Sequence, residues 1–181
     1  MPYTVHIPEG EIWLENAMMF VRTPAAAIEI EHSLNSLYKW EGIWKKPFLD
    51  LKEYTRSEFA SYVECMTLTK DVPKTAYMGL TKAISDDIVK YMADPMTATT
   101  ISSKNRKKGP NKIITAEVIY YWMIELGIPF ECQHWHLNQL MTLIAVCFEK
   151  NGGQKKMSDR EILSQYASLN ASRRAKLGTK G

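Results

Sequence analysis

The sequence predicts a mainly α fold, a helical domain of about six to seven helices with a small N-terminal β element. Two capping-box sequences, beginning at Thr55 and Ser158, mark helix starts. Short stretches of the first thirty residues instead alternate apolar and polar side chains, as half-buried strands do. Because 45% of the 181 residues are hydrophobic, the chain can bury a substantial core.

Short strands are expected at the N-terminus. Residues 4–7 alternate around Val5 and Ile7, and residues 26–30 alternate two isoleucines with a glutamate. Residues 12–14 are a third candidate strand, and Pro8-Glu9-Gly10 is typical of a turn. These patterns predict a small sheet or hairpin.

Helical spacing and capping signals predict the helices that follow. Ser85, Asp86 and Asp87 can cap a short helix, and Gly127 is a natural left-handed helix end. Helices on either side of Gly127 are expected to form an antiparallel hairpin, with the face bearing Tyr121 and Trp122 against the face bearing Leu140. We expect helices over residues 31–46, 55–68, 74–80, 88–92, 115–127, 131–149 and 158–169. The predicted domain covers residues 1–170, with residues 1–30 as its β part, and residues 171–181 form a basic flexible tail.

Charge is unevenly distributed along the chain. Residues 1–100 have a net charge of −4 and residues 101–181 a net charge of +7. A phosphate-binding patch is one interpretation of this basic excess. No aromatic residue lies among the charges of the 97–111 segment, which disfavours stacking on single-stranded nucleic acid and favours a solvated loop. The candidate basic patch consists of Lys104, Arg106, Lys107, Lys108, Lys112, Arg173, Arg174 and Lys176.

The cysteine content and the hydropathy of the chain predict its redox environment and whether it spans a membrane. Three cysteines in a chain of this length do not make a disulfide framework, so a reducing environment is expected. The N-terminus lacks the pattern of a signal peptide. The longest apolar segment, residues 113–126, is interrupted by Thr115, Glu117 and Glu125, so no membrane span or membrane partner is predicted.

Cys132, His134 and His136 are candidate metal ligands. Zinc requires three or four donors in a tetrahedral array. On a helix, residues two apart point about 200° away from each other, so His134 would not share a face with the other two. A nucleophilic pair of Cys132 and His136 fits the spacing but lacks an orienting residue. Packing in the core is therefore the favoured interpretation, and no enzyme activity, cofactor or metal is expected.

Aromatic and aliphatic residues on the predicted helices exceed what a core must contain. Such a surplus can form a surface that binds a partner helix. The candidate partner-binding residues are Leu37, Trp40, Trp44, Tyr121, Trp122, Trp135 and Leu140.

Five blocks of sequence carry a resemblance to a bacteriophage family. They are IEIEHSLNSLYKWEGIWKKPFL at 28–49, ECMTLTKDV at 64–72, PMTATT at 95–100, IITAEVIYYWMIELGIPFECQHWHLNQLMTLI at 113–144 and KKMSDREILSQYASLNASRRAKLGTKG at 155–181. Together they resemble small proteins of the tail-gene region of tailed bacteriophages, sometimes labelled tail assembly chaperones. The resemblance covers most of the chain beyond residue 28.

The resemblance implies a non-enzymatic chaperone that coats the long tape-measure protein before the tail tube polymerises around it. The implied partner is the tape-measure protein or another tail protein, with homo-oligomers as a further expectation, and the implied location is the host cytoplasm during phage assembly. Three alternatives stay open. They are a structural connector or tail-completion protein that forms a ring in the virion, a nucleic-acid-binding protein using residues 104–112, and a metal-dependent enzyme built on Cys132, His134 and His136.

Overall fold

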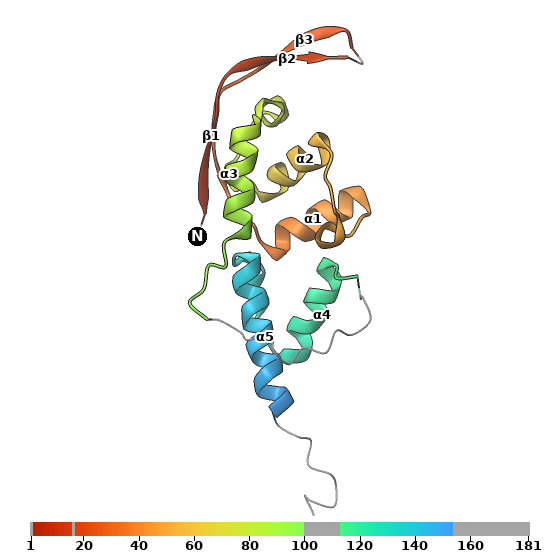
Figure 1. Cartoon of the computed structure of the whole chain (residues 1–181), viewed down its shortest axis with the longest axis vertical. Helices are drawn as coiled ribbons and strands as arrows, with labels where there is room; N and C mark the ends of the chain where they lie inside the picture. Colours follow the sequence, from red (N-terminus) through yellow and green to blue (C-terminus); the bar gives the residue numbers. More distant parts are fainter. Residues whose placement is uncertain (1, 16, 100–112, 154–181) are drawn as a thin grey trace, which may run out of the picture. The chain divides into compact units, whose positions relative to one another are not determined.

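The computed structural model describes residues 2–15, 17–99 and 113–153. The chain divides into two compact units, Met1–Ala145 and Val146–Gly181. The predicted mainly α fold with a small N-terminal β element is confirmed (Figure 1). The predicted helix at 158–169 and the predicted domain boundary after residue 170 lie outside the described residues.

The described residues contain five α-helices and three short 3-10 helices. No helix in this part of the chain is long and apolar enough to cross a membrane. The α-helices are α1 (Leu34–Trp44), α2 (Arg56–Met66), α3 (Lys82–Ala93), α4 (Ala116–Leu126) and α5 (Leu137–Gly153). The 3-10 helices are η1 (Phe48–Asp50), η2 (Lys74–Gly79) and η4 (Phe130–His134).

Four strands form two antiparallel pairs at the N-terminus. They are β1 (Tyr3–Ile7), β2 (Gly10–Leu14), β3 (Met19–Thr23) and β4 (Ala26–Ile30). β1 pairs with β4 and β2 pairs with β3, so the strands make one long bent ribbon (Figure 1). The chain reverses between β2 and β3, where Met18 has a φ of 48°, and not at the predicted turn at Pro8. The turn prediction was therefore wrong, and β3 was missed.

The ribbon bends where it crosses η2. A Cβ added to Gly79 would lie 3.1 Å from Cγ2 of Ile7 and 3.3 Å from Oγ1 of Thr23. The absence of a side chain at Gly79 therefore lets η2 approach the side chains of Ile7 and Thr23 at the bend. At the other end of the ribbon, the Glu31 N–H donates to Met66 O at 2.9 Å, which ties β4 to the end of α2.

The core lies between the ribbon and the helices. α1 and α2 pack against each other, and the Thr55–Glu58 capping box that opens α2 is formed as predicted. Trp40 of α1 is fully buried and donates from Nε1 to Glu58 O at 3.0 Å. Tyr62 of α2 stacks on Phe48, with ring centroids 3.9 Å apart.

Two predicted helices have different bounds. α3 begins at Lys82, because Oγ1 of Thr81 accepts from the Ile84 N–H at 3.3 Å, and not at residue 88. The helix predicted over 131–149 is broken at Trp135, whose backbone is extended. α5 begins only at Leu137, whose N–H donates to His32 O at 2.7 Å.

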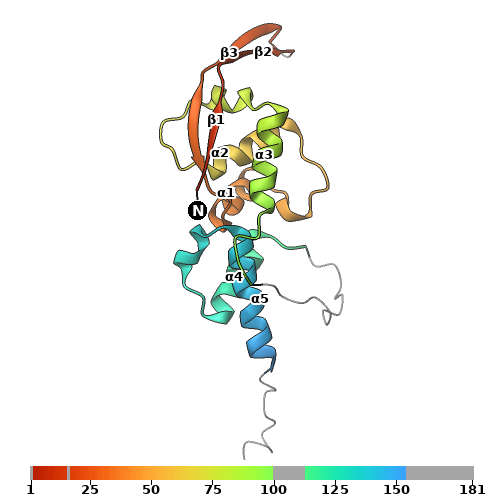
Figure 2. The same ribbon diagram turned by 60° about the vertical axis from the view of Figure 1, so that its left-hand side comes forward.

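The predicted face of α4 was also wrong. Ala116, Ile119 and Met123 are its buried residues, and the helix packs against α1. Tyr121, predicted to face the following helix, is 59% exposed. Figure 2 shows the same helices from a second direction.

Candidate functional site

The structure separates the predicted partner-binding residues into core and surface. Leu37, Trp40 and Leu140 have no exposed area, so they belong to the core and cannot meet a partner. Their selection as partner-binding residues was wrong, because apolar spacing on a helix does not distinguish an inward from an outward position.

The other four predicted residues retain some exposure. Trp44 is half-buried and donates from Nε1 to Ser61 Oγ at 3.0 Å. Trp122 is half-buried, and Trp135 is exposed. Tyr121 is the most accessible of the four, and it lies on α4.

Tyr121 lies next to Tyr120 in α4, and we call the half-buried Tyr120 and four exposed apolar side chains the aromatic surface. Tyr38 of α1 meets Tyr120 of α4 edge-on, with ring centroids 5.8 Å apart. Tyr120 in turn lies 6.2 Å from Phe130 of η4, measured between ring centroids. The members of the aromatic surface are Tyr38, Tyr120, Tyr121, Ile124 and Phe130.

This surface follows from the composition of α4. Its sequence, AEVIYYWMIEL, is apolar around nearly its whole circumference, whereas its packing against α1 uses one stripe. Tyr121 and Ile124 of α4 are left exposed, and Tyr38 and Phe130 are each about half-exposed. The sequence prediction of partner-binding residues missed Tyr38, Tyr120, Ile124 and Phe130, although the nearly continuous apolar sequence of α4 was a usable signal.

Polar groups hold part of the aromatic surface in place. The Tyr120 hydroxyl donates to Oε1 of Gln133 at 2.8 Å, which links α4 to η4. Tyrosine suits such a surface because its ring buries apolar area while its hydroxyl keeps a polar partner.

The structure does not bring Cys132, His134 and His136 together as ligands. Cys132 and His136 are buried, whereas His134 is exposed. Among the described residues there is no group of three His, Cys, Asp or Glu side chains that could hold a metal ion. The arrangement here therefore gives no support to the metal-enzyme alternative.

His136 is instead part of a buried cluster. Its Nε2 lies 3.2 Å from Tyr91 O, and its Nδ1 accepts from the Asn138 N–H at 3.3 Å. These partners assign the proton of a neutral ring to Nε2. Both ring nitrogens are thus engaged, so the ring is not placed as a base for Cys132, and burial raises the pKa of the Cys132 thiol.

His32 completes the cluster. Its ring meets that of His136 edge-on at 5.2 Å between centroids, and its Nδ1 lies 2.7 Å from the Tyr62 hydroxyl. Burial, with a smaller effect from His136, lowers the pKa of His32 to about 3. Both imidazoles are therefore neutral. His32, just before α1, contacts Tyr62 of α2, and His136, just before α5, contacts Tyr91 of α3, so the two rings have a structural role.

The predicted basic patch falls outside the described residues. It comprises Lys104, Arg106, Lys107, Lys108, Lys112, Arg173, Arg174 and Lys176.

Comparisons with protein-family models, with curated protein sequences and with solved structures find no match to this chain. The aromatic surface and the sequence resemblance are therefore the two bases for a functional proposal.

Proposed function

We propose that this chain is a non-enzymatic tail-morphogenesis protein of a tailed bacteriophage, an assembly chaperone that binds the tape-measure protein. The observation that carries the proposal is the aromatic surface on α1, α4 and η4. The blocks at 28–49 and 113–144, which carry much of the resemblance to phage tail proteins, include the members of this surface.

The chemistry of the surface suits a helical partner. An amphipathic helix binds through apolar side chains at positions i, i+3, i+4 and i+7, which need a row of apolar area on the receiving protein. Tyr38, Tyr120 and Phe130 provide such a row across three elements. Aromatic side chains with few rotatable bonds lose little entropy on binding and are frequent among residues that dominate binding energy.

A pull-down tests this proposal. The chain is co-expressed with the tagged tape-measure protein of the same phage, and the complex is sized by light scattering. We expect several copies of the chain on each tape-measure protein, and no chain in purified virions. Tyr121→Ser combined with Ile124→Ser should abolish the complex, because the two changes remove apolar area from the aromatic surface. Both side chains are exposed, so their loss leaves the core intact.

Val89→Ser is the matched control. Val89 is an apolar residue of α3 that is half-exposed and lies outside the aromatic surface. It should leave the complex unchanged. A complex that survives the double variant would refute the role of the aromatic surface, and a chain present in virions in stoichiometric amount would favour the connector alternative.

A further inference from the structure

The far end of the ribbon, residues 9–23, carries apolar side chains on both faces. Trp13 and Phe20 lie directly opposite each other on one face, with ring centroids 5.0 Å apart. Phe20 is 64% exposed, and Met18 in the turn is 79% exposed. Ile12, Leu14, Met19 and Val21 alternate with this pair and so occupy the opposite face.

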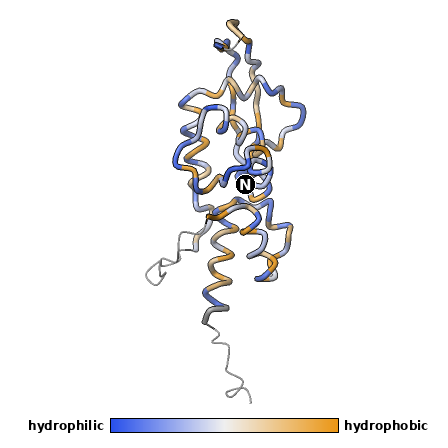
Figure 3. Tube along the Cα trace, turned by 90° about the vertical axis from the view of Figure 1, so that its right-hand side faces the viewer, coloured by the Kyte–Doolittle hydropathy of each residue, from blue (hydrophilic) through white to orange (hydrophobic). Residues whose placement is uncertain are grey.

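Packing of one ribbon face against the domain does not explain apolar side chains on both faces of the ribbon end. A strand that packs one face on a domain normally alternates apolar with polar residues. In the part of the chain that is described, β2 and β3 pair only with each other and contact η2 near the bend. A two-stranded ribbon without further cover is marginally stable in water. In Figure 3 the hydrophobic colour reaches the far end of the ribbon. The apolar residues on both faces of the far end therefore indicate a surface that another molecule covers.

The net charge of the far end indicates which kind of protein surface could bind it. Residues 9–23 contain Glu9, Glu11, Glu15 and Arg22, a net charge of −2. The three glutamates and the arginine are exposed, and Glu11 lies opposite Arg22 on the face that carries Trp13 and Phe20. A complementary surface needs exposed apolar area with an excess of basic residues.

Residues 43–56, which we call the α1–α2 surface, meet this description. Lys45, Lys46, Lys52 and Arg56 outweigh Asp50 and Glu53, which gives a net charge of +2. Three large apolar side chains are exposed among these charges, Ile43, Leu49 and Tyr54, and Ile43 is 63% exposed. The two surfaces thus match in opposite net charge and in exposed apolar content.

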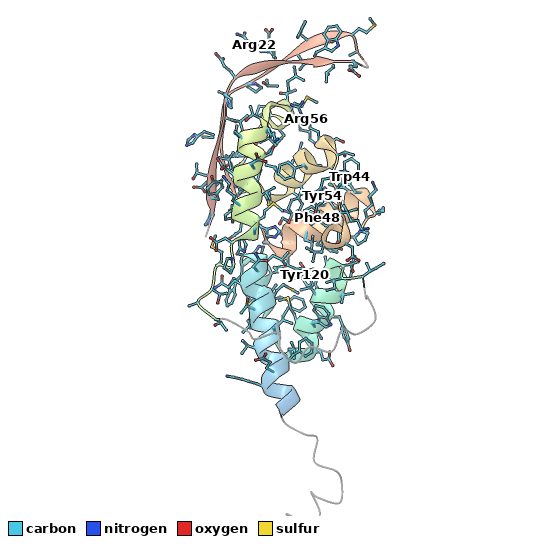
Figure 4. All side chains as sticks on the ribbon, in the orientation of Figure 1. Arg22, Trp44, Phe48, Tyr54, Arg56 and Tyr120 are labelled. Carbon is cyan, nitrogen blue, oxygen red and sulfur yellow. The ribbon has the colours of Figure 1, made fainter. Side chains whose placement is uncertain are left out.

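We propose that the ribbon end of one copy of this chain binds the α1–α2 surface of a second copy. Figure 4 places Arg22 on the ribbon well apart from Trp44 and Tyr54, so each copy offers both surfaces at once. The interface is heterologous, since it joins two different surfaces. Head-to-tail contacts of this kind produce a closed ring or an open chain of copies. This inference does not depend on binding to a tape-measure protein.

A charge exchange tests the pairing. In one variant the ribbon is made basic by Glu11→Lys with Glu15→Lys. In the other, the α1–α2 surface is made acidic by Lys45→Glu with Lys52→Glu. All four residues are exposed, so both variants should retain the wild-type circular dichroism and unfolding midpoint. The full-length chain is studied by sedimentation velocity at low salt.

The wild type should associate, and each variant alone should associate at least about tenfold more weakly, since about 1.4 kcal/mol changes an association constant tenfold. An equimolar mixture of the two variants should regain association, because each basic ribbon then meets an acidic surface and each acidic ribbon meets a basic one. The Tyr121→Ser, Ile124→Ser variant should associate like the wild type, which separates this interface from the aromatic surface.

Three results would overturn the inference. A wild type that stays monomeric at about 100 µM would leave the ribbon end for a different partner. Unchanged association of the Lys45→Glu, Lys52→Glu variant would show that the α1–α2 surface does not bind the ribbon end. Failure of the mixture to recover, with both variants folded, would show that the two surfaces do not meet.

Discussion

Glu41 offers a direct test of how α4 is held against the rest of the fold. Its side chain is buried on α1, and its two carboxylate oxygens accept hydrogen bonds from two separate elements. Oε1 accepts from the Phe48 N–H at 3.0 Å, and Oε2 accepts from the Ala116 N–H at 2.8 Å. Burial raises the pKa of Glu41, and the N–H groups of Ala116 and Phe48 partly oppose that rise.

The expected cost of removing this carboxylate follows from those two bonds. A hydrogen bond to a charged group contributes about 1.5–3 kcal/mol, and an unpaired buried donor carries a further penalty. Glu41→Ala removes both acceptors, so we expect a loss of about 3–5 kcal/mol in the free energy of unfolding. Glu41→Gln retains one acceptor oxygen, so its loss should be about 2 kcal/mol.

Urea unfolding at pH 7, followed by circular dichroism, measures these losses. The control is Glu125→Ala, an exposed glutamate of α4, which should change the free energy by less than about 0.5 kcal/mol. The reasoning would be refuted if Glu41→Ala cost no more than Glu125→Ala, or if the glutamine variant were the less stable of the two Glu41 variants.

Two further predictions concern the acid range and the glycines. Because the pKa of His32 is about 3 in the fold and 6.5 for an unperturbed histidine side chain, the unfolded chain binds more protons between these values. Stability should therefore fall as pH drops from about 6.5 towards 3, by up to about 1.4 kcal/mol per pH unit, and His32→Gln should reduce this slope in urea titrations at several pH values. Gly79→Ala should destabilise the chain by about 1–3 kcal/mol, because its Cβ would lie 3.1 Å from Ile7 Cγ2. Gly42→Ala, which has no atom within 4 Å of the added Cβ, should stabilise α1 by about 0.5–1 kcal/mol, and equal thermal shifts for the two glycine variants would contradict this packing argument.

The sequence predicted an element correctly where the pattern that defines it joins residues close together in the chain. The capping box at Thr55 depends on residues three apart, and it forms as predicted. β4 shows strict alternation, with Ile28 and Ile30 buried and Glu29 exposed. β3 was missed because Met19, Phe20 and Val21 are apolar in succession, and in this strand only Thr23 is buried.

Long-range contacts explain the other errors. The helix predicted over 131–149 is interrupted because the Leu137 N–H bonds to His32 O and because Ser33 forms a bridge with His136. No pattern within residues 131–149 encodes a partner at residue 32. For the same reason Trp40 could not be assigned to the core until the positions of Phe48 and Tyr62 around it were known.

The contact between His32 and His136 has a consequence for synthesis on the ribosome. The ribbon, α1 and α2 are complete once residue 66 has emerged, and their mutual contacts join residues near in sequence. His32 has Tyr62 beside its Nδ1 once α2 has formed, but the ring of His136 can cover it only when residue 136 appears. The segment after β4 therefore stays partly uncovered on the nascent chain until the start of α5 emerges and the Leu137 N–H can bond to His32 O.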